Sequence, residues 1–283
     1  MKDLQIRSLY ELSFDKLSDV FLSAFSDYEM VLDRKKLKSI FHRRGADTAL
    51  SFGAYDGSSL VSFIINGIGK FRGVATAYDT GTGTVAEYRG RGLTDRIFKY
   101  AAKQLCEVGI KQYLLEVLQH NIPAIKIYKR QGFEITREFH CYHINDGDLK
   151  AKTSKGIKIV KESVDSILPI LRFMDFEPSW QNGIESVLRV PDAFNVLVAY
   201  QDEMPVGYGV TESAYGDVAQ LAVDPSYRGY GIATGLLVEM LKLSDTHQLR
   251  IVNVDASDKG FNAMLTSLGF TLNCSQYEMI RSF

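Results

Sequence analysis

The chain has 283 residues, of which 46% are hydrophobic and 24% charged, and its formal net charge is −1. This length is enough for about two domains, each with its own core. The near-zero charge argues against nucleic acid as the main partner, because no excess of Lys or Arg is available to neutralise phosphates. No window approaches the ~18 consecutive apolar residues of a membrane span, and the first residues lack the apolar core of a signal peptide. We therefore expect a cytoplasmic protein with no nucleic-acid or membrane partner.

Cysteine and histidine residues give no sign of a disulfide framework or a metal site. Cys106, Cys141 and Cys274 have no paired spacing, which is typical of thiols in a reducing compartment. His140 and His143 would point to opposite faces of a strand, so they are poorly placed to share a metal ion. We expect no metal.

The first half of the chain predicts an α/β domain that opens with a strand and a helix. Alternating or short apolar runs and a turn signal predict strands at Ile6 to Leu9, Ala49 to Tyr55, Leu60 to Ile68, Val74 to Val85, Tyr113 to Leu118 and Glu134 to Ile144. Helical spacing and capping residues predict helices at Phe14 to Phe25, Asp33 to Arg44, Leu93 to Val108 and from Asn121 to Gly132. The turn Asp56-Gly57 joins two of the strands into a hairpin. Gly81 and Gly83 predict a bulge or a close backbone approach within the fourth strand.

A polar, glycine-bearing stretch from Asn145 to Gly156 carries almost nothing to bury and predicts a linker. We place the linker at 147–156, between domains at 1–146 and 157–283. After it the plan restarts with a strand at Ile157 to Val160 and helical spacing through Ile167, Ile170, Leu171 and Met174. The remaining predicted elements are strands at Phe194 to Tyr200, Val206 to Thr211, Val218 to Val223 and Arg250 to Val254, and helices at Ile232 to Leu243 and Lys259 to Leu268.

One short motif occurs twice, each time between a predicted strand and a predicted helix. It reads Tyr-Arg-Gly-Arg-Gly at 88–92 and Tyr-Arg-Gly-Tyr-Gly at 227–231. A later Gly-Phe pair also recurs, at 132–133 and at 269–270, with nearly the same offset between its copies. Two motifs that recur in step indicate a duplicated domain.

The repeated motif has the features of an anion-binding loop. Its glycines allow a tight turn and a close backbone approach, and the free N–H groups of the following helix attract a phosphate or pyrophosphate. Arg89 and Arg228 can add charge-assisted hydrogen bonds from the same turn. Two other glycine-rich phosphate loops are excluded, because neither copy completes Gly-x-Gly-x-x-Gly and the chain has no Gly-Lys-Ser/Thr.

What remains resembles the coenzyme A loop of the GNAT acetyltransferase superfamily, Arg-x-x-Gly-x-Gly/Ala. The first copy matches at Arg89 and Gly92, with Thr94 in the last position, and the second matches fully at Arg228, Gly231 and Ala233. The first half also carries Asn-x-x-Ala-x-x-x-Tyr-x-x-x-Gly-Phe, at Asn121, Ala124, Tyr128, Gly132 and Phe133. The resemblance implies two tandem α/β domains, each with a mostly antiparallel sheet flanked by helices. In a domain of this family, the fourth and fifth strands would diverge and hold the pantetheine arm of coenzyme A between them.

The resemblance also implies direct acetyl transfer from acetyl coenzyme A to an amine, with no metal. Tyr128 matches the usual general acid, which would protonate the leaving thiolate. Asp79 is the acidic residue of the fourth strand best placed to act as the base, whereas a solvent-facing role is preferred for Glu87. Asn121 is expected to contact the cofactor and to cap its helix. The expected coenzyme A-binding residues are Thr84, Val85, Arg89, Gly90, Arg91, Gly92, Leu93, Thr94, Asn121, Arg228, Gly229, Tyr230, Gly231, Ile232 and Ala233.

The second half departs from the pattern where the chemistry would occur. Counted from its Gly-Phe pair, Asp258 and Leu265 stand in the positions of Asn121 and Tyr128, and leucine cannot donate a proton. Three outcomes stay open: cofactor bound in both halves, a second half that only scaffolds the substrate site, or catalysis there without a tyrosine acid. We favour chemistry in the first half.

The expected acceptor is a primary amine of a small molecule, amino acid or peptide. The tandem layout also resembles mycothiol synthase-type duplicated acetyltransferases, which adds a cysteinyl sugar amine to the candidates. Two alternatives are a non-catalytic coenzyme A-binding or sensing protein and an aminoacyl-transfer enzyme on the same duplicated fold. Either a monomer or a homodimer is compatible with this sequence.

Overall fold

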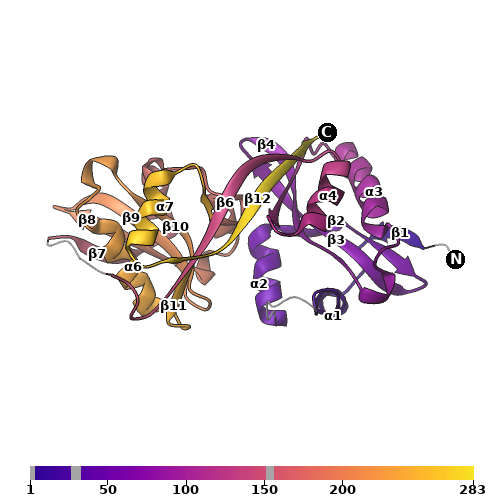
Figure 1. The fold of residues 1–283 in the computed structure, drawn as a ribbon, viewed down its shortest axis with the longest axis horizontal. Coiled ribbons are helices and arrows are strands. Elements are labelled where there is room, and N and C mark those ends of the chain that lie inside the picture. Colours follow the sequence, from indigo (N-terminus) through magenta and orange to yellow (C-terminus); the bar gives the residue numbers. More distant parts are fainter. Residues whose placement is uncertain (1–3, 27–32, 151–155) are drawn as a thin grey trace. The chain divides into compact units, whose positions relative to one another are not determined.

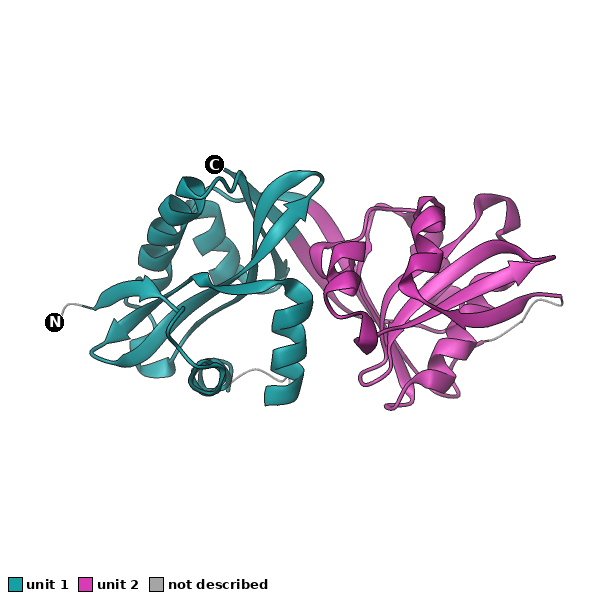
Figure 2. Ribbon diagram, turned by 180° about the vertical axis from the view of Figure 1, so that it is seen from behind, with its two compact units in different colours: residues 1–136, 278–283 teal, residues 137–277 magenta. Residues whose placement is uncertain are grey.

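The computed structural model describes residues 4–26, 33–150 and 156–283, and the chain divides into two compact units. Unit 1 consists of 1–136 with 278–283, and unit 2 of 137–277 (Figure 2). The strands that begin in the first half are β1 (Gln5–Ser8), β2 (Ala46–Asp56), β3 (Ser59–Phe71), β4 (Val74–Thr84), β5 (Gln112–Leu118) and β6 (Glu134–Asn145). The helices are α1 (Phe14–Ala24), α2 (Arg34–Arg44), the short 3₁₀ helix η1 (Ala86–Tyr88), α3 (Leu93–Glu107) and α4 (Ile122–Arg130) (Figure 1).

The second half repeats most of this order. Its strands are β7 (Lys158–Glu162), β8 (Asn195–Gln201), β9 (Met204–Glu212), β10 (Asp217–Val223), β11 (Gln248–Asp255) and β12 (Thr271–Ser282). Its α-helices are α5 (Ile184–Arg189), α6 (Ile232–Leu243) and α7 (Lys259–Ser267). Four 3₁₀ helices complete it: η2 (Val164–Phe173), η3 (Trp180–Asn182), η4 (Pro191–Ala193) and η5 (Pro225–Tyr227). Among the described residues, no helix combines the length and the apolar character needed to cross a membrane.

Most predicted elements are confirmed, because their signals are local. Asp33 caps α2 through its side chain, and Gly45 ends that helix at φ 73°. Three elements differ: the helical spacing near Ile167 forms 3₁₀ turns around Pro169, and neither α5 nor β12 was predicted. Of the predicted linker, residues 151–155 lie outside the described part of the chain.

The sheet of unit 1 has the strand order β1-β2-β3-β4-β5, antiparallel except for the last pair. Helices α1 and α2 pack on one face, where Leu17, Phe21, Leu37 and Phe41 join a core cluster with Phe63 of β3. Helix α3 lies against the same strands and buries Ile97 and Phe98, whose ring contacts Tyr113 of β5. A mixed sheet flanked by helices, as expected, is therefore confirmed.

Strands β4 and β5 are parallel neighbours only at their beginning. Their register runs from Thr76 opposite Gln112 to Tyr78 opposite Leu114, although β4 continues to Thr84 and β5 to Leu118. The expected divergence of the fourth and fifth strands is thus present. It leaves the second half of β4 without a strand partner on the β5 side.

A bulge interrupts β4 next to this divergence. Asn66 of β3 pairs with Asp79 and the preceding Ile65 pairs with Gly81, so Thr80 is the extra residue. The predicted close approach is also present, because a Cβ on Gly81 would lie 2.7 Å from the Phe21 ring and one on Gly83 2.6 Å from the Phe63 ring.

Unit 2 repeats the plan with the order β6-β11-β10-β9-β8-β7. Its parallel pair, β10 and β11, is in register only at Asp217 and Arg250 before it diverges. The bulge recurs in β10, where Val218 pairs with Thr211 and Gln220 with Val210, leaving Ala219 extra. Helices α6 and α7 cover one face through a cluster that includes Leu237, Met240 and Leu265.

The units exchange strand segments. After its first three residues β6 belongs to unit 2 and pairs there with β11, whereas the last residues of β12 belong to unit 1 beside β5. The N–H of Phe283 donates to the carbonyl of Lys111 at 2.9 Å, and the Phe283 ring contacts Tyr113. The contacts therefore divide the chain at 136/137, whereas the repeat boundary at 147–156 stays a prediction from the sequence.

Candidate active site

The predicted anion loop of unit 1 joins the end of β4 to the start of α3. Gly90 and Gly92 have φ angles of 73° and 68°, and Gly92 occupies the cap position of the helix. A Cβ at either glycine would meet no atom within 4 Å, so glycine is needed here for the backbone angle. The first N–H groups of α3 have no partner within the helix, and the buried Leu93 anchors this turn to the core. The loop thus presents amides and a positive helix end.

The side chain of Arg89 fixes this loop to its own unit. Its Nε donates to the carbonyl of Thr84 at 3.2 Å and its Nη2 to the carbonyl of Ala24, at the end of α1, at 3.0 Å. Arg228 does the same in unit 2, where Nε donates to the Val223 carbonyl at 3.2 Å. The arginine that defines the motif therefore braces the loop against the strand before it.

The other predicted loop residues surround this turn. Thr84 Oγ1 lies 2.7 Å from Ser62 Oγ, and the N–H of Val85 donates to the Val61 carbonyl. Arg91 lies over the Tyr88 ring and donates to the carbonyl of Glu87, whose own side chain is exposed as expected. Thr94 is half-buried in the first turn of α3.

The bulge in β4 decides which polar side chains share a face. Asp79 and Thr82 are three residues apart, so in a regular strand their side chains would point to opposite faces. Because Thr80 is extra, Asp79, Thr82 and Thr84 oppose Asn66, Ile64 and Ser62, which alternate along one face of β3. The Thr82 hydroxyl accordingly donates to Asp79 Oδ2 at 2.7 Å. A polar cluster thus lies on β4 where it leaves β5.

Asp79 is the carboxylate of this cluster, and its pKa differs from the ordinary value. Burial raises its pKa from 3.8 to about 6. Hydrogen bonds from Thr82 and Tyr128, the Gly81 amide and the charge of Arg44 oppose this effect only partly. Oδ1 of Asp79 is buried and has no hydrogen-bond partner among the residues that the structure describes. A carboxylate with a pKa near 6 is a suitable proton acceptor close to neutral pH.

Tyr128 projects from α4 toward the same carboxylate. Asn121 caps this helix by accepting a hydrogen bond from the Ala124 N–H at 3.2 Å, as predicted. The Tyr128 ring packs edge-on against Phe98 and Phe133, and its hydroxyl lies 3.5 Å from Asp79 Oδ2. The structure thus brings together the two residues that the sequence analysis proposed separately as acid and base.

Three polar residues with contacts to β4 or β3 were not predicted as site residues. Thr82 holds Asp79, and the buried Tyr113 hydroxyl donates to Asn66 on β3. Glu116 of β5 accepts a hydrogen bond from the Tyr78 hydroxyl at 3.0 Å. Nothing in the sequence indicated that Thr82 would contact Asp79, because only the bulge brings the two side chains to one face. Glu116 has the pattern of an ordinary strand residue.

Unit 2 replaces the polar cluster with core residues. Aligned on the two loop arginines, Asp79, Thr82 and Thr84 correspond to Val218, Leu221 and Val223, all three buried in the cluster beneath α6 and α7. Leu265, in the position of Tyr128, is fully buried there as well. The second loop nonetheless keeps its shape, with φ 81° at Gly229 and at Gly231. Ile232 is buried, Ala233 half-buried and Tyr230 exposed, so unit 2 preserves the loop but no acid–base pair.

A glycine loop at a helix start and parallel strands that diverge beside it are the features expected of an acetyltransferase domain of the GNAT type. Family models agree in both halves: residues 7–133 match "Acetyltransferase (GNAT) family" and residues 192–272 match "Acetyltransferase (GNAT) domain". The chain belongs to the GNAT acetyltransferase family and carries two of its domains in tandem.

Similar proteins cover different shares of the chain. A mycothiol acetyltransferase from Corynebacterium aurimucosum is 39% identical over 59 residues, which are 21% of this chain and 19% of that protein. An N-alpha-acetyltransferase MAK3 from Arabidopsis thaliana is 28% identical over 99 residues, 35% of this chain and 52% of that protein. The chain thus matches about a fifth and about half of these relatives' lengths. A solved tandem GNAT protein from the clavulanic acid biosynthesis pathway shares the fold, with a TM-score of 0.73, 13% identity and coverage of 99% of this chain and 98% of that one.

Proposed function

We propose that this protein is an N-acetyltransferase that moves an acetyl group from acetyl coenzyme A to a primary amine, with the chemistry in unit 1. The observation that carries this proposal is the pairing of Tyr128 with Asp79 at 3.5 Å beside the divergence of β4 and β5. Family membership supports the reaction class. The names of the two relatives support an amine acceptor on a small molecule or a peptide.

Coenzyme A fits the donor set of the loop. Its pyrophosphate would meet the free amides of α3 around Gly90 and Gly92, where the φ angles and the open space let a ligand approach the backbone. Arg89 would hold the loop in this shape through the carbonyls of Thr84 and Ala24. Acetyl coenzyme A supplies the thioester as the second substrate.

The residues of unit 1 would then handle two protons. The neutral amine attacks the thioester carbon, a C–N bond forms and the C–S bond breaks. Asp79 accepts the proton that leaves nitrogen, and Tyr128 gives its phenolic proton to the departing sulfur. The hydrogen bond between the two residues lets Asp79 return a proton to the phenolate, so the site regains its starting state without net proton exchange. No nucleophilic side chain is needed.

Thiol release tests this proposal. The full chain is incubated with acetyl coenzyme A and a panel of amines: amino acids, amino sugars and peptides with free amino termini. We expect at least one amine to raise thiol release well above the amine-free rate, and mass spectrometry to find the acetylated amine. Coenzyme A binding without acceleration by any amine would replace this proposal with the non-catalytic alternative.

A further inference from the structure

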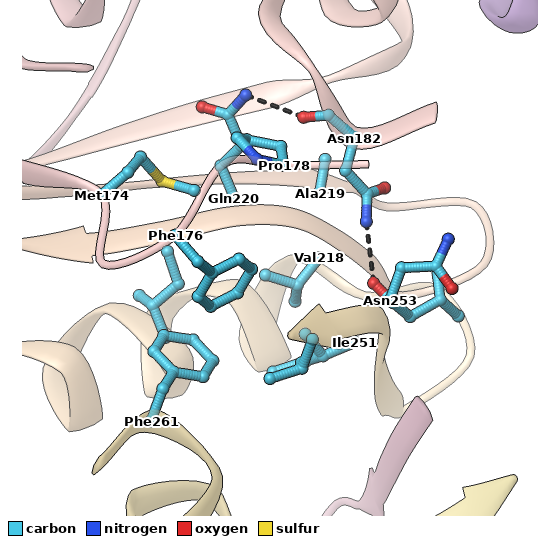
Figure 3. A pocket seen from close by; sticks show the side chains of 13 residues that line it. Met174, Phe176, Pro178, Asn182, Val218, Ala219, Gln220, Ile251, Asn253 and Phe261 are labelled. Carbon is cyan, nitrogen blue, oxygen red and sulfur yellow. Dashed lines mark hydrogen bonds between the residues drawn. The ribbon is translucent and has the colours of Figure 1, made fainter. Parts of the chain in front are cut away.

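In unit 2, side chains of the protein itself lie where the parallel strands β10 and β11 diverge. Asn182, at the end of η3, donates from Nδ2 to the Val252 carbonyl of β11 at 2.8 Å, and its own carbonyl accepts from Gln220 Nε2 of β10 at 2.8 Å (Figure 3). The Tyr208 hydroxyl donates to the other amide atom of Gln220 at 3.2 Å. Asn182 therefore links the diverging strands through buried polar groups. Its side-chain amide, its carbonyl and the Val252 carbonyl already have hydrogen-bond partners within the protein.

Aromatic and apolar side chains fill the adjoining space. Phe261 of α7 stands at the position of Ala124, four residues before Leu265 as Ala124 is four residues before Tyr128, and its ring packs edge-on against Phe176 at 5.4 Å. Together with Val218 and Ile251 these rings leave a hollow of only about 20 Å³, and no charged side chain lines it. Phe261, which stands in the position of the small Ala124 of unit 1, therefore borders this hollow (Figure 3).

The electrostatics of the second loop also differ. Arg228 Nη1 forms an ion pair with Asp175 Oδ1 at 2.8 Å, and Asp224 stands four positions before Arg228, where unit 1 has Val85 before Arg89. Asp224 uses its carboxylate to cap η5, accepting from the Ser226 N–H at 2.9 Å. The first loop also has two carboxylates, Glu87 and Asp95, but it carries two arginines, Arg89 and Arg91, whereas Tyr230 stands in the position of Arg91 in the second loop. The second loop is therefore the less favourable of the two for a pyrophosphate.

We propose that the Asn182 bridge and the Phe261 ring close unit 2 to the pantetheine arm, so that the chain has a single acyl-coenzyme A site, in unit 1. The proposal rests on the proposed function and names which of the two loops that function uses. Unit 2 keeps the loop shape because Arg228 and the glycines build the turn itself. The residues at the positions that would face a ligand, Val218, Leu221 and Val223, are instead buried in the core. The duplicated domain thus contributes structure and strand pairing, with one donor substrate per chain.

Calorimetric titration of the full chain with coenzyme A tests this inference through a matched pair of variants. Gly90→Val and Gly229→Val place the same strained side chain at corresponding loop positions, with φ 73° and 81° and nothing within 4 Å of either Cβ. We expect one site per wild-type chain, loss of binding by at least ~30-fold in Gly90→Val, and unchanged binding in Gly229→Val. Circular dichroism and thermal melting verify that each variant is folded.

A second readout reports on unit 2 directly. Trp180 is the only tryptophan of the chain and lies buried on η3, two residues before Asn182. Saturating coenzyme A should leave its emission unchanged, which gives an answer even if one of the variants fails to fold. Two sites per chain, weaker binding in Gly229→Val or a saturable change of Trp180 emission would overturn the inference and leave the proposed function standing. No coenzyme A binding at all would instead overturn the proposed function.

Discussion

The hydroxyl of Tyr128 lies 3.5 Å from Oδ2 of Asp79, although 49 residues separate them in the chain. One residue comes from α4 and the other from the bulged strand β4, so the contact forms only when helix and sheet pack together. The hydroxyl of Thr82, also on β4, donates to the same oxygen of Asp79 at 2.7 Å. Each of these three side chains can be changed without removing much buried apolar surface, which makes them good subjects for mutation.

Replacing Asp79 with asparagine should remove the base and one source of pH dependence. Because burial raises the pKa of Asp79 to about 6, the wild-type kcat/KM should fall as the pH drops through about 6, where the carboxylate becomes protonated. Asp79→Asn should lower kcat/KM by ~10²-fold at pH 8 and abolish this acid limb. Steady-state rates between pH 5 and 9 measure both effects. An intact acid limb in the variant would exclude Asp79 as the titrating group.

The same substitution should stabilise the fold at alkaline pH. A carboxyl group whose pKa is raised on folding favours the native state below its unfolded pKa of about 4, and this contribution is lost as the pH rises through about 6. A pKa difference of one corresponds to about 1.4 kcal/mol, and the half-buried position of Asp79 reduces the total to about 2 kcal/mol. Urea unfolding of wild type and Asp79→Asn should therefore diverge between pH 4 and 7, with the variant more stable above about pH 6. Parallel curves would contradict the raised pKa.

Tyr128→Phe should slow acetyl transfer ~10²-fold while leaving coenzyme A binding intact. The ring contacts with Phe98 and Phe133 are kept, so only the hydroxyl is lost. Tyr142→Phe is the matched control, because its hydroxyl bonds Asn262 in unit 2, and we expect no change of rate. Single-turnover measurements separate the chemical step from product release. Equal rates for wild type and Tyr128→Phe would remove Tyr128 from the mechanism.

Thr82→Val should shift the pH profile without removing a reacting group. The Thr82 hydroxyl stabilises the charged form of Asp79, so its loss should raise the pKa of Asp79 further. A hydrogen bond to a charged group is worth about 1.5 kcal/mol, which corresponds to about one pH unit. The acid limb of kcat/KM should move to higher pH by about this amount. Thr84→Val, whose hydroxyl pairs with Ser62 instead, should leave the limb in place; a shift of equal size there would point to a general change of the strand.

Removing the last six residues should damage unit 1, although they follow the whole of unit 2 in the sequence. They supply the segment of β12 beside β5 and the Phe283 ring that contacts Tyr113. A chain ending at Tyr277 should lose most of its activity and melt at lower temperature, while Phe283→Ala, which removes a half-buried ring, should lower the stability by about 1–2 kcal/mol. Activity assays and thermal melting measure both. Wild-type activity in the shortened chain would show that unit 1 does not need this strand.

Local signals account for what could be predicted. The cap at Asp33, the Asp56-Gly57 turn and the repeated glycine loops each depend on a few adjacent residues, and the structure reproduces all of them. The constant offset between the repeated motifs also predicted the duplication, because two copies of a fold require two copies of its turns. Tyr128 and Asp79 were candidates from the resemblance and from their residue types.

Only the tertiary structure decided which of these residues meet. The bulge at Thr80 turns Asp79 and Thr82 to one face, Arg89 proves to brace its loop, and Asn182 bridges two strands that lie far from it in sequence. Strand β12 was missed because it pairs beside β5, a strand from the other half of the chain, and no local pattern records such a pairing. The sequence by itself determined the elements, the loops and the duplication, since these follow from short-range geometry. Packing alone decided that Tyr128 meets Asp79 and that Asn182 bridges β10 and β11, because those contacts join segments that have no fixed spacing along the chain.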